Sequence, residues 1–354
     1  MTGILGLDIG GANTKSCSLR MDKGEISMAR GASVYHEVWR KPEGLRDVLM
    51  DLRASMIQGD TTIEGIALTM TAELCDGFES KTQGVLFILG MVEEVFADVP
   101  VYVWTTRGVF AHPCEIRKEP LQAAAANWLA SATALAGSPF LAGNPVIFAD
   151  MGSTTTDILP LASGKVLAKG KTDTERLLYG ELLYTGTLRT GVHSILDEVY
   201  LEGHCCRVAH EYFAISADAY RFLGLITETD YDVPTPDGKN RDIDACAKRL
   251  ARVVGAEPEE IGINNIYSIA RAVMEKQTRR ITDNILRIIS RKDVPEPKQL
   301  ITTGQGSFIL GEVARRLGWK ETPWWQMIPG GYGQLAMTSY AVAWLLYRQI
   351  QKEM

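Results

Sequence analysis

Gly3-Ile-Leu-Gly-Leu-Asp-Ile-Gly-Gly-Ala-Asn-Thr-Lys15 decides the fold, because Phe148-Ala-Asp-Met-Gly-Ser-Thr-Thr-Thr-Asp157 repeats its pattern far downstream. In each copy an apolar run predicts a buried strand, which is followed by an acid and a tight turn. Strand-like residues continue after each turn, so each copy is predicted to be a β-hairpin. The aligned pairs are Asp8 with Asp150, Gly10 with Gly152, Gly11 with Ser153 and Thr14 with Thr156.

The two turns have the chemistry of a phosphate site. Glycine has no Cβ to block close approach, and successive backbone N–H groups form an anion-binding concavity. An acid at the end of each strand suits Mg²⁺, which prefers few carboxylates together with water and phosphate oxygens. We therefore expect the turns to face each other across a cleft and to hold one diphosphate, with magnesium bound by Asp8 and Asp150.

A third glycine turn supports this interpretation. Leu300-Ile-Thr-Thr-Gly-Gln-Gly306 precedes the apolar Phe308-Ile-Leu310, which predicts a strand, a glycine turn and then a helix. A single Asp-X-Gly-Gly turn would be an ordinary hairpin. The repeat and the third element, in this order, favour a phosphate-binding fold instead.

Composition bounds the class of protein. A length of 354 residues predicts about two domains, and 46% apolar with 23% charged residues is typical of a globular protein. A net charge of -6 without a long basic run argues against nucleic acid as a partner. No stretch predicts a membrane span or a signal peptide. Six cysteines without CxxC spacing are expected to be reduced thiols of a cytoplasmic protein.

Strands and helices alternate along the first half of the chain, which predicts an α/β architecture. We expect an N-terminal lobe of residues 1–143, which a C-terminal helix over 333–351 completes. The C-terminal lobe is expected over residues 144–332, with a mostly helical segment inserted at 173–291.

Two acids follow a predicted strand end, where α/β folds gather functional groups. Glu73 or Asp76 is a candidate general base, and the alternative is that both are solvated loop acids or helix N-caps. Lys81, one turn later, is a candidate phosphate contact or a residue on a solvated helix face.

A polar loop follows in the second half. Arg176-Leu-Leu-Tyr-Gly-Glu-Leu-Leu-Tyr-Thr-Gly-Thr-Leu-Arg-Thr190 gathers donors beside flexible turns, which indicates either an anion-binding loop or a surface loop with capping groups. His204-Cys-Cys206 with His210 has no second ligand pair, so ordinary thiols are favoured over zinc.

At this point the chain resembles the superfamily of sugar kinases, heat-shock ATPases and actin. Asp8-Ile-Gly-Gly-Ala-Asn-Thr14 is similar to its first phosphate motif, Asp150-Met-Gly-Ser-Thr-Thr-Thr-Asp157 to its second, and Thr303-Gly-Gln-Gly306 to its adenosine motif. The second motif looks especially like the hydantoinase and oxoprolinase branch. The resemblance implies a two-lobed, ribonuclease H-like fold with duplicated hairpins.

Three longer stretches resemble the synthase family of methanofuran biosynthesis, which is linked to one-carbon metabolism. They are Thr69-Met-Thr-Ala-Glu-Leu-Cys-Asp76, Tyr179-Gly-Glu-Leu-Leu-Tyr-Thr-Gly-Thr-Leu-Arg-Thr190 and Phe213-Ala-Ile-Ser-Ala-Asp-Ala-Tyr220. The resemblance spans nearly the whole chain. It implies a transferase that joins the phenol of γ-glutamyltyramine to an aminomethylfuran-methyl diphosphate and expels pyrophosphate, with Mg²⁺ and without a requirement for ATP.

The physics of the residues fits that reaction. A phenol has a pKa near 10, so a positioned carboxylate would help it react, and Glu73, Asp76, Asp8 and Asp150 are the candidate catalytic acids. The candidate contacts to substrate and diphosphate lie in the turns, in the polar loop and on two lysines. They are Gly10, Gly11, Asn13, Thr14, Lys15, Lys81, Gly152, Ser153, Thr154, Thr155, Glu181, Tyr184, Arg189, Gly304 and Gly306.

Two other classes of function remain open from the sequence. The same turns would bind ATP, so an ATP-dependent kinase or a hydantoinase-like enzyme is the alternative. A non-catalytic scaffold switched by a nucleotide is the third possibility. Both the ATP-dependent enzyme and the nucleotide-switched scaffold would depend on a nucleotide, whereas the transferase would turn over without one. The sequence does not predict an oligomeric state.

Overall fold

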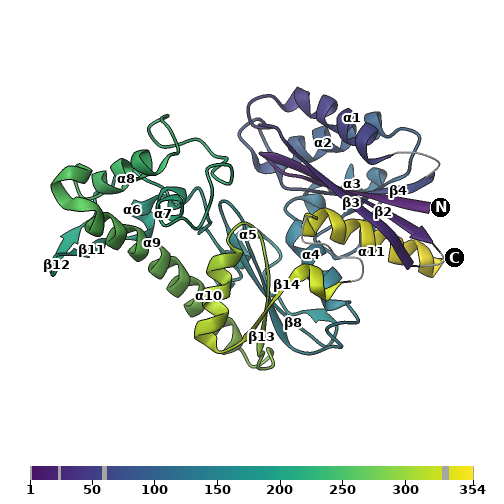
Figure 1. Ribbon diagram of the computed structural model, residues 1–354. Helices are drawn as coiled ribbons and strands as arrows, with labels where there is room; N and C mark the ends of the chain where they lie inside the picture. The colour runs from purple at the N-terminus through teal and green to yellow at the C-terminus, as the bar shows by residue number, and fades with distance from the viewer. Residues whose placement is uncertain (1, 23–24, 58–61, 329–334, 354) are drawn as a thin grey trace.

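A computed structural model describes residues 2–22, 25–57, 62–328 and 335–353 of the chain. Their strands form two six-stranded sheets and a separate two-stranded hairpin. Figure 1 shows the first sheet close to both termini, and the helices α8 and α9 with the small hairpin at the opposite end of the molecule.

The first sheet has the order β3-β2-β1-β4-β5-β6. Its strands β1, β2 and β3 are antiparallel neighbours, whereas β4 and β5 run parallel to β1. Their bounds are β1 (Thr2–Ile9), β2 (Asn13–Asp22), β3 (Glu25–Tyr35), β4 (Thr62–Met70), β5 (Val101–Trp104) and β6 (Phe110–Ala111).

The second sheet repeats this arrangement. It has the order β10-β8-β7-β13-β14, with β9 paired to β8. Again an antiparallel hairpin, β7 and β8, is followed by strands parallel to its first member. The bounds are β7 (Val146–Met151), β8 (Thr156–Ala162), β9 (Lys165–Val166), β10 (Leu182–Leu183), β13 (Gln299–Thr303) and β14 (Lys320–Pro323).

Helices cover both faces of the first sheet. Leu5, Leu7 and Ile9 of β1 pack in one apolar cluster with α1 (Leu45–Met56) and α2 (Lys81–Val95). The opposite face packs on α11 (Met337–Glu353), which also contacts α4 (Asn127–Ala136). The helix approaches so closely that a Cβ on Gly6 would lie 2.0 Å from the carbonyl oxygen of Ser339.

The segment over 173–291 is partly helical and partly extended. Its helices are α5 (Asp173–Tyr179), α6 (Val192–Ile195), α7 (Ser216–Phe222), α8 (Ile243–Arg252) and α9 (Pro258–Ile289), and its hairpin is β11 (Glu198–Leu201) with β12 (His204–Arg207). Cys206 therefore lies on a strand and shares no helix face with His210.

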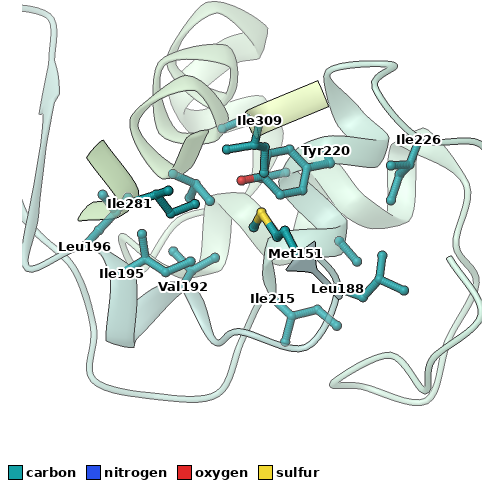
Figure 2. Packing of buried hydrophobic residues seen from close by; sticks show 14 of the residues in the cluster. Met151, Leu188, Val192, Ile195, Leu196, Ile215, Tyr220, Ile226, Ile281 and Ile309 are labelled. Carbon is teal, nitrogen blue, oxygen red and sulfur yellow. The ribbon is translucent and has the colours of Figure 1, made fainter. Parts of the chain in front are cut away.

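A large apolar cluster joins this segment to the second sheet. Met151 of β7 belongs to the same cluster as Tyr220 of α7 and Ile281 of α9, and Figure 2 shows these side chains converging. The α10 helix (Ser307–Leu317) contributes Ile309 to it. The insertion is thus anchored directly behind the second glycine hairpin.

The remaining elements are short. They are α3 (Pro113–Ile116) and the 3₁₀ turns η1 (Pro42–Gly44), η2 (Ala72–Leu74), η3 (Pro120–Ala123) and η4 (Trp324–Met327). The C-terminal helix begins at Met337, and positions 333 and 334 of the range predicted for it lie outside the described residues. The division into lobes at residue 143 stays a prediction. None of the described helices is long and apolar enough to span a bilayer.

Candidate active site

The two glycine hairpins close in the same way. In the first, Asp8 pairs with Lys15 across the strands, and the Gly10 N–H donates to the carbonyl of Asn13 at 3.0 Å. In the second, Asp150 pairs with Asp157, and the Gly152 N–H donates to the carbonyl of Thr155 at 2.9 Å. The predicted duplication of the hairpin is confirmed, since both register and turn closure agree.

Alternation along the strands explains why both acids face the same space. Side chains two residues apart point to the same face of a strand. Asp8 therefore continues the row of Ile4, and Asp150 continues the row of Val146 and Phe148. These three apolar residues belong to one shared core, which lies between the two sheets and contains α4 and α11. The side chains of Asp8 and Asp150 consequently point to the same side of their sheets as this core does, and both carboxyl groups face one cleft.

The cleft contains a cavity of about 420 Å³ into which both hairpins project. Lys15 from the first hairpin and Arg189 from the polar loop are its cations. The ten predicted site residues that line it are Asp8, Asn13, Lys15, Asp150, Gly152, Ser153, Thr154, Thr155, Arg189 and Gly304.

A second cavity, of about 550 Å³, adjoins the first. The two share Asp8, Lys15 and Arg189, so together they form one continuous cleft. This second cavity adds Gly10, Gly11 and Asp76 to the predicted residues that face the cleft. Trp39 and Leu74 give it an apolar wall.

A third cavity, of about 390 Å³, extends from the other side of the first. It shares Lys15, Asp150 and Gly304 with the central cavity. Trp324 and Trp325 line it, together with residues at the start of α11. Gly304 has a φ of +88°, and a Cβ there would lie 2.6 Å from Oδ1 of Asp150. The third glycine turn therefore packs directly against the second acid.

The electrostatics of the two acids depend on burial. Desolvation raises the pKa of Asp8, and the nearby Lys15 opposes that shift. Desolvation also raises the pKa of Asp150 to about 7, with further increases from Asp157 and Asp8 and a decrease from Lys15. Two partly dehydrated carboxylates thus share one lysine.

These residues fit a magnesium ion. Two neighbouring carboxylates with a single compensating lysine favour an added cation, and Mg²⁺ in phosphate sites uses one or two carboxylates with water and phosphate oxygens. Within the described part of the chain, no group of three or more His, Cys, Asp or Glu side chains forms an all-protein metal cage. Asp8 and Asp150 would hold the ion.

A following segment docks on each turn. After the first hairpin, the N–H groups of His36 and Val38 donate to the carbonyls of Ala12 and Gly11, each at 3.0 Å. After the second, the Thr187 N–H donates to the carbonyl of Gly152 at 2.9 Å, and the N–H groups of the next two residues donate to Ser153. The first docked segment is followed by Trp39, and the second ends at Arg189.

Trp39 and Arg189 meet across the cleft. The guanidinium carbon of Arg189 lies 5.9 Å from the ring centroid of Trp39, within the range of a cation–π contact. The described residues provide no acidic partner for Arg189, and its Nε has no hydrogen-bond acceptor among them. Arg189 is therefore available to an anion in the cleft.

Glu73 occupies a different environment. Its side chain is 1% exposed, and Oε1 accepts a hydrogen bond from the Ala125 N–H at 2.9 Å. Burial raises the pKa of this carboxyl group. Glu73 lines none of the three cavities, whereas Asp76, three residues later, lines the second.

Glu181 also lies away from the cavities. It is fully buried, accepts hydrogen bonds from the N–H groups of Lys169 and Gly170, and pairs with Arg291 at 2.7 Å. These contacts tie the start of the polar loop to the end of α9. The other predicted site residues that line none of the three cavities are Thr14, Lys81, Tyr184 and Gly306.

Several residues that line the cleft were not among the predicted site residues. Asp157 belongs to the quoted second motif, and its repeat position opposite Asp150 is a signal that could have identified it. Trp39 and Asp232 lie on loops outside the motifs, Asn127 begins α4, and no pattern in the sequence marks these three residues.

Comparison with known proteins decides the family. The profile of the hydantoinase/oxoprolinase family matches residues 64–349. A curated protein of Methanocaldococcus jannaschii, (4-{4-[2-(gamma-L-glutamylamino)ethyl]phenoxymethyl}furan-2-yl)methanamine synthase, is 36% identical over 355 residues, which cover 99% of each chain. The chain belongs to this synthase family and to the hydantoinase/oxoprolinase family. The synthase of the same name from Methanococcus vannielii is 33% identical over 59% of this chain and 93% of its own.

The comparison of structures agrees on the fold. A nucleotide-free structure of acetone carboxylase superposes with a TM-score of 0.56 at 11% identity, covering 96% of this chain and 70% of its own. The predicted two-lobed, actin- and sugar-kinase-like α/β fold is confirmed. The predictions of membership in the synthase family and of an enzyme that acts on small molecules are confirmed as well.

Proposed function

We propose that this member of the synthase family forms an aryl ether in methanofuran assembly. The substrates are the phenol of γ-glutamyltyramine and an aminomethylfuran-methyl diphosphate, and the leaving group is pyrophosphate. The relation to the Methanocaldococcus jannaschii synthase along 99% of both chains supports this choice most strongly. The protein is expected to work in the cytoplasm, where its free cysteines stay reduced.

The cleft suits the diphosphate of the donor. Backbone N–H groups of the two glycine turns, Lys15 and Arg189 would bind its oxygens, because these groups line the continuous cleft that the first two cavities form. Mg²⁺ held by Asp8 and Asp150 would neutralise charge on the leaving diphosphate. The cations come from opposite sides of the cleft, so they orient the diphosphate between the two hairpins.

Asp76 is our choice for the general base. The phenol oxygen attacks the methylene carbon attached to the furan, and the bond from that carbon to the diphosphate oxygen breaks. Its electron pair leaves with pyrophosphate, and the phenolic proton moves to the carboxylate of Asp76. Of the two candidate acids, Asp76 lines the cleft and Glu73 is held by Ala125. A carboxylate accepts such a proton from within hydrogen-bond reach, either directly or through one water molecule.

The test is a reconstitution without nucleotide. Purified protein, both substrates and Mg²⁺ should give the ether and pyrophosphate in equal amounts, measured by mass spectrometry and a coupled phosphate assay. Adding ATP should not raise the rate. Absence of ether formation together with rapid ATP hydrolysis would overturn the proposal.

An ATP-dependent enzyme, either a kinase or a hydantoinase-like catalyst, is the second candidate. The third cavity favours it, because its tryptophans and the third glycine turn adjoin the central cavity and offer space for a nucleoside. Strict dependence of turnover on ATP would identify this candidate.

A further inference from the structure

Gln277 lies deep in the molecule, on α9, and its side chain is fully buried. Its amide nitrogen donates to Oγ1 of Thr185 at 2.7 Å and to the carbonyl of Gly186 at 3.0 Å. Its amide oxygen accepts a hydrogen bond from the hydroxyl of Tyr220. Gln277 lines none of the cleft cavities, so these contacts are its connection to the cleft.

Gly186, whose carbonyl accepts a hydrogen bond from Gln277, packs against the second glycine turn. A Cβ on Gly186 would lie 2.5 Å from the carbonyl oxygen of Ser153, so only glycine permits this approach. The Gly186 carbonyl also accepts hydrogen bonds from the hydroxyls of Ser216 at 3.1 Å and Thr190 at 3.2 Å. The carbonyl is thus fixed from three directions.

The chain leaves this fixed point toward the cleft. The N–H groups of Thr187, Leu188 and Arg189 donate to Gly152 and Ser153 at 2.9 to 3.1 Å. The guanidinium group of Arg189 then reaches Trp39, which follows the segment docked on the first turn. A displacement at Gly186 would therefore move both the second turn and the cation that faces it.

We propose that Gln277 is a positioning residue for the diphosphate site, acting through Gly186 on Arg189 and on the turn at Ser153. The inference rests on the proposed function, since it assumes that this cleft binds diphosphate. A glutamine suits the role because it pairs with two acceptors and one donor at once. A buried amide left without partners is costly, so the pairing restricts the loop to one position.

The experiment compares variants of two neighbouring buried residues on α9 and of Tyr220 on α7. Gln277→Met keeps the length of the side chain and removes every hydrogen bond to the loop. Thr278→Val is the matched control, because Thr278 is also fully buried but its hydroxyl donates to the carbonyl of Met274 within the same helix. Tyr220→Phe is a milder second variant that removes the hydroxyl bonded to Gln277 and leaves the glutamine in place.

Two measurements are made on the full chain with Mg²⁺: the Kd of pyrophosphate by calorimetry and the KM of each substrate. We expect Gln277→Met to raise the Kd and the KM of the furan diphosphate by about tenfold, the effect of about 1.4 kcal/mol. The KM of γ-glutamyltyramine should change by less than about twofold. Tyr220→Phe should shift the same quantities in the same direction by a smaller factor, and Thr278→Val should leave them unchanged.

The outcomes separate the two proposals. If wild-type protein binds pyrophosphate and both Gln277→Met and Tyr220→Phe bind it equally well, the positioning role is wrong and the proposed function stands. An equal loss of pyrophosphate affinity in Thr278→Val would also overturn the positioning role, because that loss would reflect general destabilisation of α9. Wild-type protein that does not bind pyrophosphate overturns the proposed function and the positioning role together. If Gln277→Met does not fold, Tyr220→Phe decides between the outcomes.

Discussion

Lys15 occupies, in the first hairpin, the register position that Asp157 occupies in the second. Arg176 neutralises Asp157 at 2.6 Å and lies over the ring of Trp128 at 4.2 Å. The described residues give Lys15 no ion-pair partner, although it lines all three cavities. The repeated structure therefore carries opposite charges at equivalent positions, and the positive one faces the cleft, where an anion could contact it.

Replacing Lys15 tests that charge directly. We expect Lys15→Met to weaken binding of Mg²⁺-pyrophosphate by about 10- to 100-fold, since a charged hydrogen bond contributes about 1.5–3 kcal/mol. Isothermal calorimetry measures the change. Lys165→Met on β9 is the control, because this exposed lysine lies outside the three cavities. Equal affinities of the two variants for Mg²⁺-pyrophosphate would show that Lys15 does not contact the diphosphate.

Asp76 and Glu73 should respond differently to loss of charge. We expect Asp76→Asn to lower kcat by roughly 10²- to 10⁴-fold without lowering the melting temperature, since an exposed general base is lost. Glu73→Gln should keep kcat within about threefold, because its oxygen can still accept the Ala125 N–H at a site outside the cleft. Rates of ether formation and thermal melts check both. The reverse pattern would assign the base to Glu73.

Gly304 provides a test of how the third turn supports the second acid. Gly304→Ala and Gly203→Ala both place a side chain at positive φ, +88° and +83°, and each should cost roughly 1 kcal/mol of backbone strain. The added Cβ at Gly304 meets Asp150 and Met151, whereas the one at Gly203 meets nothing within 4 Å. We expect only Gly304→Ala to weaken metal-dependent pyrophosphate binding. Similar affinities in both variants would show that Asp150 tolerates the intrusion.

The hairpins could be predicted from sequence because each is a local pattern. Asp8 and Asp150 each end an apolar run and precede a glycine turn, so one short continuous segment of sequence predicts the strand, the acid and the turn together. Their approach to each other follows from alternation, since Ile4 and Phe148 reach the same core. The repeat itself carried the information that a cleft exists between two similar halves.

Long-range contacts could not be predicted in this way. The burial of Glu73 depends on Ala125, which lies in a distant loop, and nothing near Glu73 distinguishes it from Asp76. Glu181 is a structural ion-pair partner because Arg291 returns to it from the end of α9. Gln277 is one polar residue in a long helix, a pattern that usually indicates a solvated position.

The most direct test of the central claim is a crystal structure with pyrophosphate and Mn²⁺ in place of Mg²⁺, using anomalous scattering to locate the metal. The account predicts one pyrophosphate between the turns at Gly10 and Gly152, with the metal between the carboxyl groups of Asp8 and Asp150. Pyrophosphate bound to one turn alone, or a metal held away from both acids, would contradict it.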